Sequence, residues 1–121
     1  MNLKIEKTNL TPFVHLKQGL IELNGKSVPE NPHAFYDPII NWITRYTTNP
    51  AKFTEVKLSL EYLNSNSCIY IFKILQILQN SYNEGNAMAI NWYCEEDDEI
   101  MIGLAGDYKT LLEIPFNVIL S

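Results

Sequence analysis

The chain has 121 residues with 46% hydrophobic and 19% charged side chains and a net charge of −5, which together indicate one folded domain and exclude a wholly disordered chain. The negative charge also argues against general binding of nucleic acids. No apolar run approaches the roughly 20 residues that span a bilayer, and residues 1–7 lack the apolar stretch of a secretory signal, so we expect a cytoplasmic protein that does not enter a membrane.

The N-terminal quarter predicts strands joined by tight turns. Residues 1–10 are expected to form an edge strand or a loose arm. Two apolar stretches flank Gln18-Gly19, which predicts a hairpin with Gly19 in its turn. Asn24-Gly25 is also typical of a turn and predicts a second one soon after the hairpin.

A helix is predicted to follow these strands. Asn31 can cap it through its side chain, and Pro32 fits its first position. Pro38 lies inside the helical pattern, so we expect either a kink there or a restart of the helix at Asp37-Pro38. The apolar residues that recur at helical spacing are Phe35, Ile39, Trp42, Ile43 and Tyr46.

The middle of the chain predicts a strand, a polar connection, a helix and another strand. In residues 54–63 apolar and polar side chains alternate, which indicates a strand with one buried face. Residues 64–67 interrupt the pattern before a dense apolar helix. Residues 87–94 alternate again, and the small Ala87 and Ala89 on their second face predict a helix packed closely there. Such a unit normally forms a right-handed parallel crossover.

The C-terminal part completes the predicted fold. The acidic run at residues 95–99 leads into a short helix, residues 107–112 are a second helical candidate, and residues 115–120 are a candidate closing strand. We therefore predict a single α/β domain over residues 1–121, with one mixed β-sheet and helices packed on it.

The polar connection at residues 64–67, Asn-Ser-Asn-Ser, is the segment most able to carry a function. Its short side chains can cap the following helix, and capping alone would be a sufficient role. A helix N-terminus also presents free N–H groups and a partial positive charge, so a phosphate on a hydroxyl there is compatible with the fold. That phosphate would add close to two negative charges where a partner could meet them. The segment therefore predicts either a simple cap or a phosphorylation switch.

Several segments, in order along the chain, resemble the SiaC family of small bacterial regulatory phosphoproteins. They are GKSVPEN at 25–31, FYDPIINW at 35–42, LEYLNSNS at 60–67, NWYCEEDDE at 91–99, GDY at 106–108 and PF at 115–116. The resemblance covers nearly the whole chain. It implies a small α/β sandwich similar to the anti-sigma-factor antagonist (STAS-like) domains, in which a hydroxyl at a helix N-terminus is also the switch.

The resemblance also implies a role without catalysis and without a cofactor or metal. Members of the family are switch proteins in biofilm control. A dedicated Ser/Thr kinase phosphorylates them, and a PP2C-type phosphatase reverses the modification. The unphosphorylated form binds and activates a diguanylate cyclase, which raises the level of cyclic di-GMP.

The site residues carry over from the family position by position. The family's phosphoacceptor is usually a Thr in an Asn-Thr-Ser-Ser stretch, and that position falls on Ser65 here. Asn66 replaces the next Ser of the pattern, whereas Ser67 is retained and is a second candidate acceptor. The resemblance thus implies that Asn64, Ser65, Asn66 and Ser67 form a modified loop that contacts the partner.

The acidic run is a second candidate surface for partner binding. Residues 61–121 hold nine Asp/Glu and only two Lys, which either keeps the chain in solution or attracts a basic partner. We expect Glu95, Glu96, Asp97 and Asp98 to neighbour the modified loop, with Asp97 or Asp98 capping the next helix. The run lacks the alternate ligands and mid-loop Gly of a calcium site, so we predict no metal.

Two other hypotheses remain open at this point. A small metal-dependent enzyme could use the acidic run and a nearby His, although neither His15 nor His33 has a Ser or Cys partner at a recognisable spacing. A constitutive structural or binding subunit would act only through its partner. Cys68 and Cys94 are too few for a disulfide framework or a four-thiolate zinc site, and we expect two buried free thiols.

Overall fold

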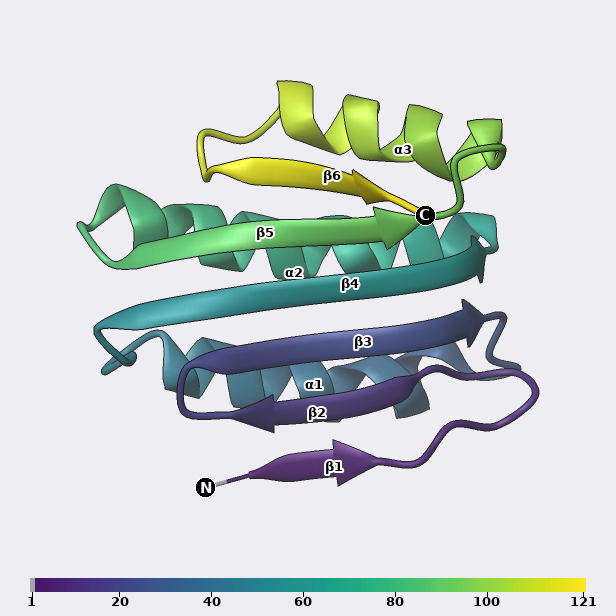
Figure 1. Ribbon diagram of the computed structural model, residues 1–121. Coiled ribbons are helices and arrows are strands. Elements are labelled where there is room, and N and C mark those ends of the chain that lie inside the picture. Colours follow the sequence, from purple (N-terminus) through teal and green to yellow (C-terminus); the bar gives the residue numbers. More distant parts are fainter. Residues whose placement is uncertain (1) are drawn as a thin grey trace.

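The computed structural model describes residues 2–121, which form one six-stranded sheet and three helices (Figure 1). In chain order the elements are β1 (Leu3–Ile5), β2 (Phe13–Lys17), β3 (Leu20–Ser27), α1 (Pro32–Tyr46), β4 (Phe53–Leu63), α2 (Ser65–Asn83), β5 (Ala87–Cys94), α3 (Glu99–Thr110) and β6 (Phe116–Leu120). None of the helices in this part of the chain is long and apolar enough to cross a membrane.

The strands lie in the sheet in the same order as in the chain. β1, β2 and β3 pair antiparallel, whereas β3, β4, β5 and β6 pair parallel. A helix connects each parallel pair, and because such crossovers are right-handed, a sheet that grows in one direction carries these helices on one face. Figure 1 shows α1 and α2 behind the sheet and α3 next to β6 at the top of the view. The predicted α/β fold with a mixed sheet is confirmed.

The core lies between the helices and the sheet face that they cover. In β4, Thr54, Val56, Leu58 and Leu60 are buried in turn, as the alternation in the sequence predicts, but Tyr62, expected on the same face, is 50% exposed. β5 repeats the pattern with Met88, Ile90, Trp92 and Cys94, and Trp92 is fully buried. The two strands are paired in register, so their buried side chains form one apolar surface under α2 and α3.

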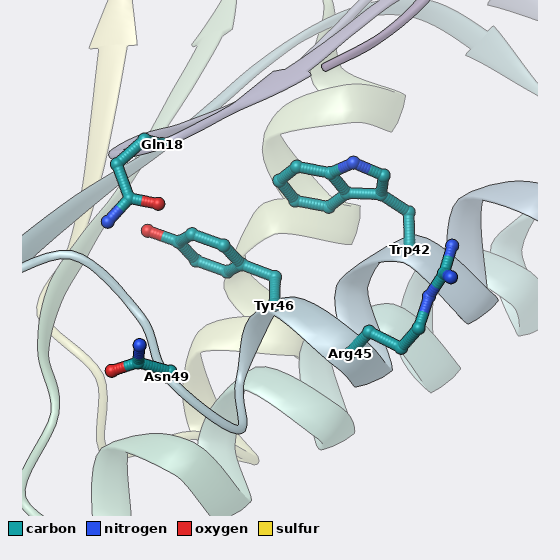
Figure 2. Close-up of a pocket in the computed structure, with 5 residues that line it drawn as sticks. All are labelled: Gln18, Trp42, Arg45, Tyr46 and Asn49. Carbon is teal, nitrogen blue, oxygen red and sulfur yellow. The ribbon is translucent and has the colours of Figure 1, made fainter. Parts of the chain in front are cut away.

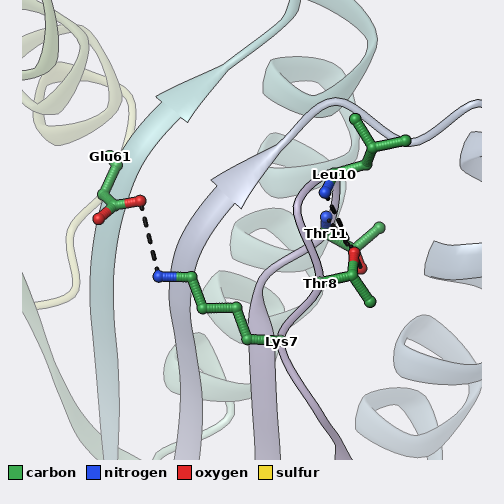
Figure 3. Close-up of polar contacts among 5 residues, drawn as sticks. All are labelled: Lys7, Thr8, Leu10, Thr11 and Glu61. Carbon is green, nitrogen blue, oxygen red and sulfur yellow. Dashed lines mark hydrogen bonds and ion pairs between the residues drawn. The ribbon is translucent and has the colours of Figure 1, made fainter.

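The N-terminal segment forms an edge strand, β1, rather than a loose arm. After β1 the side chain of Thr8 accepts the N–H groups of Leu10 at 3.1 Å and Thr11 at 2.9 Å, which closes a compact turn (Figure 3). Lys7 reaches Glu61 of β4, with Nζ 3.7 Å from the carboxylate (Figure 3). Of these contacts, the exposed Lys7–Glu61 pair is the one that joins the segment to the sheet, near the end of β4.

The hairpin between β2 and β3 is confirmed, with Gly19 in its turn at a φ of +83°. The second predicted turn, at Asn24-Gly25, is wrong, because both residues lie inside β3. The pairing with β4 shifts between Gly25 and Lys26, and Gly25 has a φ of +131°. A Cβ at Gly25 would lie 3.3 Å from Cα of Pro12. Gly25 therefore serves a β-bulge and a close approach of two backbone segments.

The cap of α1 is confirmed, with the side chain of Asn31 accepting the N–H of Ala34 and Pro32 at the first position. The helix continues through Pro38, so the predicted restart at Asp37 is wrong. The two helices expected between residues 95 and 112 are a single helix, α3. Gly103 and Gly106 lower the helix propensity between the two predicted pieces, but the Asp98 cap and the buried Met101, Ala105 and Tyr108 hold the segment as one helix.

The helix predicted on the second face of β5 is absent from the described residues. Ala89, Asn91 and Tyr93 are half-buried on the sheet face that the helices leave open. There Asn91 donates to the carboxylate of Glu55 and accepts a hydrogen bond from Asn117, each at 3.0 Å. Consecutive right-handed crossovers place all the helices on the opposite face of the sheet. The side chains on the open face of β5 therefore have polar side chains as neighbours and no helix of the described chain.

Candidate functional site

The predicted site begins where β4 ends. Asn64 is the N-cap of α2, and its side chain accepts the backbone N–H of Ser67 at 2.9 Å. The helix itself starts at Ser65, so the four-residue loop expected over residues 64–67 is wrong, and one residue joins the strand to the helix. Once Asn64 supplies the cap, the short polar residues after it fit the first helical turn.

Ser65 and Ser67 lie in the same turn but differ in exposure. Ser65 occupies the first helical position and is exposed, as is Asn66. Ser67 is 0% exposed. The hydroxyl of Ser65 is therefore accessible to another protein, whereas reaching that of Ser67 requires the first turn of α2 to open.

Ser67 is buried in a cluster of three hydroxyl groups with Ser27 and Tyr36. Its hydroxyl donates to the carbonyl oxygen of Ser27 at 2.9 Å. Oγ of Ser27 lies 2.8 Å from Oγ of Ser67 and 2.6 Å from the hydroxyl oxygen of Tyr36. Burial raises the pKa of Tyr36 more than the two neighbouring serine hydroxyls lower it, so the phenol keeps its proton at neutral pH.

The sequence analysis missed this cluster. In β3 the buried positions are Ile21, Leu23, Gly25 and Ser27. Ser27 is therefore a polar residue at a position where the alternation puts the side chain on the buried face. A buried polar group needs a hydrogen-bond partner. The position of Ser27 in the alternating pattern was therefore the signal that could have identified the cluster.

The two histidines have structural neighbours. The hydroxyl of Tyr70 is hydrogen-bonded to Nδ1 of His33 at 2.5 Å, and the ring of Tyr70 stacks on Tyr36 with centroids 4.9 Å apart. His33 thereby links the start of α1 to α2. His15 lies in β2 beside the ring of Phe13, 6.2 Å between centroids. In the described chain neither histidine bonds to a Ser or Cys side chain.

Three exposed apolar side chains lie on or near the segments that meet at the start of α2, and we call Tyr62, Ile69 and Ile100 the apolar surface. They are 50%, 54% and 76% exposed. Ile69 follows Ser65 by four residues and so lies next to it on the helix. Tyr62 and Ile100 line a cavity of about 410 Å³ between the end of β4, α2 and the start of α3. Clustered exposed apolar groups mark surfaces that bind other proteins.

The acidic run lies at the same edge of the sheet, because β4 and β5 are parallel neighbours and both connections leave at their carboxyl ends. Asp98 is half-buried and caps α3 by accepting the N–H of Met101 at 3.1 Å, as predicted. Glu95, Glu96 and Asp97 are exposed. Within residues 2–121, no hydrogen bond or ion pair joins residues 95–98 to residues 64–67. The next acidic residue, Glu99, lines the cavity beside the apolar surface.

The cysteines are free, and burial raises the pKa of both thiols. Cys94 is buried, as predicted, whereas Cys68 is only half-buried and lines the cavity beside the apolar surface. Among residues 2–121, no three His, Cys, Asp or Glu side chains lie together in a way that could hold a metal ion.

A separate cavity of about 250 Å³ lies at the opposite end of the parallel strands. Figure 2 shows the five residues that line it, which are Gln18, Trp42, Arg45, Tyr46 and Asn49. The hydroxyl of Tyr46 accepts the N–H groups of Gly19 and Ala51 and lies 2.6 Å from Oγ1 of Thr54, which holds the neighbouring loops together. None of the residues predicted for the site lines this cavity.

Comparison with known proteins supplies the context for the site. Residues 5–121 match the family described as "SiaC family regulatory phosphoprotein". An uncharacterized protein of Pseudomonas aeruginosa strain UCBPP-PA14 is 26% identical over 119 residues, which cover 97% of this chain and 94% of the relative.

Solved structures share the fold over the full length. SiaC of Pseudomonas aeruginosa matches with a TM-score of 0.92 at 24% identity and covers 100% of this chain and 99% of its own. A chain of the crystal structure of the diguanylate cyclase SiaD in complex with its activator SiaC, from the same species, matches with a TM-score of 0.93 at 26% identity and coverages of 98% and 99%. Because the family match extends over residues 5–121, this chain belongs to the SiaC family of regulatory phosphoproteins.

Proposed function

We propose that this chain is a non-enzymatic cytoplasmic switch that binds and activates a diguanylate cyclase while Ser65 is unmodified. A Ser/Thr kinase adds a phosphate to Ser65, and a PP2C-type phosphatase removes it. The family supports a regulatory role, and the related SiaC is the activator of the cyclase SiaD in their complex. The observation that carries the proposal for this chain is the exposed hydroxyl of Ser65 at the first position of α2.

The position of Ser65 explains how a phosphate could act without unfolding the chain. The helix N-terminus offers N–H groups and a partial positive charge to a phosphate, so the first turn tolerates the modification. The phosphate would stand beside Ile69, on the surface that also includes Tyr62 and Ile100. Close to two negative charges there would lose their water when a partner docked, and that cost would weaken the complex.

The polar residues around Ser65 complete the proposed partner surface. Asn64 and Asn66 flank the hydroxyl, and the acidic residues Glu95, Glu96, Asp97 and Asp98 leave the sheet at the same edge. We assign these acidic residues to contacts with basic side chains of the partner, which would speed association and fix orientation. Ser67 is the second candidate acceptor, and its hydroxyl is buried whereas Ser65 is exposed, which supports Ser65 as the first candidate.

The proposal is tested by intact-mass measurement and peptide mapping of the protein isolated from its own cells, before and after phosphatase treatment. We expect one phosphate on Ser65, lost in Ser65→Ala and retained in Asn66→Ala, the matched neighbour. Ser65→Ala should stay bound to the cyclase under all growth conditions. A kinase that labelled Ser65→Ala as strongly as the wild type would contradict Ser65 as the acceptor. Absence of phosphate under every condition would favour a constitutive binding subunit.

A further inference from the structure

The carbonyl oxygen of Ser27 receives hydrogen bonds from both sides of the phosphoacceptor. The backbone N–H of Asn64, one residue before Ser65, donates to it at 3.2 Å. The hydroxyl of Ser67, two residues after Ser65, donates to it at 2.9 Å. A single backbone atom at the end of β3 thus anchors both flanks of Ser65, although Ser27 is 38 positions away in the chain.

The hydrogens of the cluster can be assigned by elimination. The carbonyl of Ser27 carries no hydrogen, so Ser67 must donate its only hydroxyl hydrogen there. Oγ of Ser67 can then only accept from the hydroxyl of Ser27, 2.8 Å away. Oγ of Ser27, having donated, accepts from Tyr36 at 2.6 Å. Each hydroxyl hydrogen is used once, and the chain of bonds runs in one direction from Tyr36 to the Ser27 carbonyl.

We propose that Ser27 and Ser67 are positioning residues that hold the first turn of α2 in the conformation in which Ser65 is presented to its kinase and its partner. This inference rests on the proposed function of Ser65. The side chain of Ser65 makes no hydrogen bond within the described chain, so its place in space depends on its neighbours. The N-cap of Asn64 orders the helix end, and the Ser27 carbonyl ties that end to the sheet.

The bonds predict a graded series of variants. Ser67→Ala removes the bond to the Ser27 carbonyl and leaves the Ser27 hydroxyl without its acceptor, so it should loosen the turn most. Ser27→Ala keeps the carbonyl and should have a smaller effect. Tyr36→Phe leaves the bonds between Ser27 and Ser67 intact and should leave the turn unchanged. Ser67→Thr retains the hydroxyl, so it should keep most of the order that the turn has in the wild type.

The control is another buried serine of the same helix. Ser81 is 2% exposed near the C-terminal end of α2, and its hydroxyl accepts a hydrogen bond from Asn86 at 3.0 Å. Ser81→Ala removes a comparable buried bond at the far end of the helix. It should lower stability by a similar amount without loosening the turn that carries Ser65.

The test measures amide hydrogen exchange together with the initial rate of Ser65 phosphorylation by the kinase of the source bacterium. In Ser67→Ala we expect exchange at the Asn64 and Ser67 amides to rise roughly tenfold, as loss of one buried hydrogen bond implies, and the phosphorylation rate to fall several-fold. Ser81→Ala should change neither. Exchange that stayed at the wild-type rate in both Ser67→Ala and Ser27→Ala would overturn the inference.

The two proposals fail separately. If the turn loosens in Ser67→Ala but Ser65 is still phosphorylated at the wild-type rate, positioning by Ser27 and Ser67 is refuted and the switch remains. If no phosphate ever reaches Ser65, the proposed switch is refuted. In that case the exchange result still decides whether the cluster holds the first turn of α2. Partner binding by Ser67→Ala then decides whether the order of this turn is needed for binding.

Discussion

The hydroxyl of Tyr108 in α3 donates a hydrogen bond to the backbone carbonyl of Cys68 in the first turn of α2, at 2.8 Å. Cys68 follows Ser65 by three residues. The ring of Tyr108 also lies parallel to Phe72, with centroids 6.2 Å apart, and meets Trp92 edge-on at 5.8 Å. α3 is therefore attached to the turn that carries Ser65, and this turn has anchors in both β3 and α3.

Replacing Tyr108 by Phe removes that hydrogen bond and keeps the ring. We predict a loss of about 1 kcal/mol in the free energy of unfolding, measured by urea denaturation, with an unchanged dependence on urea. Tyr82→Phe is the control, because Tyr82 is half-buried in the same layer and its hydroxyl makes no hydrogen bond within residues 2–121. Equal stability of Tyr108→Phe and the wild type would show that the bond contributes nothing net.

The N-cap of α2 should contribute measurably to stability. Asn64→Ala removes the acceptor for the N–H of Ser67, and we predict a loss of about 1 kcal/mol in the free energy of unfolding. Asn66→Ala is the matched control, since Asn66 is exposed two residues later, and it should change stability by less than about 0.5 kcal/mol. The prediction fails if the two variants unfold at the same urea concentration.

Stability should fall in alkaline solution. Burial raises the pKa of both Tyr36 and Tyr108 above the ordinary value of 10.0, so the folded chain holds these protons more tightly than the unfolded chain. Their contribution is complete below that value and is lost as the pH rises through the folded pKa values, at up to ~1.4 kcal/mol per pH unit for each group. Urea denaturation at several pH values above about 9 measures this slope. In Tyr36→Phe and Tyr108→Phe the slope should be shallower, and an equal slope in all three proteins would contradict the assignment.

The apolar surface should matter for binding and not for folding. Ile100 is 76% exposed, so Ile100→Glu should change the free energy of unfolding by less than about 0.5 kcal/mol. We predict that it weakens binding to the proposed cyclase partner roughly tenfold or more, measured by titration calorimetry. Leu111→Glu is the control, because Leu111 is 63% exposed at the other end of α3. Equal loss of binding in both variants would point to charge rather than to this surface.

Sequence patterns predicted the elements whose signal is local. The alternation in residues 54–63 gave β4, and the side chains of Asn31 and Asp98 identified the starts of α1 and α3. The connection at residues 64–67 was predicted too long, because Ser and Asn fit both a loop and the first turn of a capped helix. The segment forms the first turn of the helix because Asn64, and not a later residue, is the N-cap.

The candidate site was predictable only in part, because its supports come from distant elements. The family resemblance indicated Ser65, but Ser27 and Tyr108 reach the same turn from β3 and α3 through tertiary packing. The second face of β5 was assigned wrongly for a similar reason. The small size of Ala89 is a local property, whereas which face receives a helix depends on the handedness of every crossover in the sheet.

The sequential order of the strands has a consequence for how the chain is made on the ribosome. Each strand pairs only with the strands immediately before and after it, so a growing chain can add every new strand to a partner that has already been synthesised. Ser27 is translated before Ser65, and Tyr108 after it. The anchor in β3 is therefore available when α2 emerges, and the turn that carries Ser65 acquires its last contact only when α3 arrives.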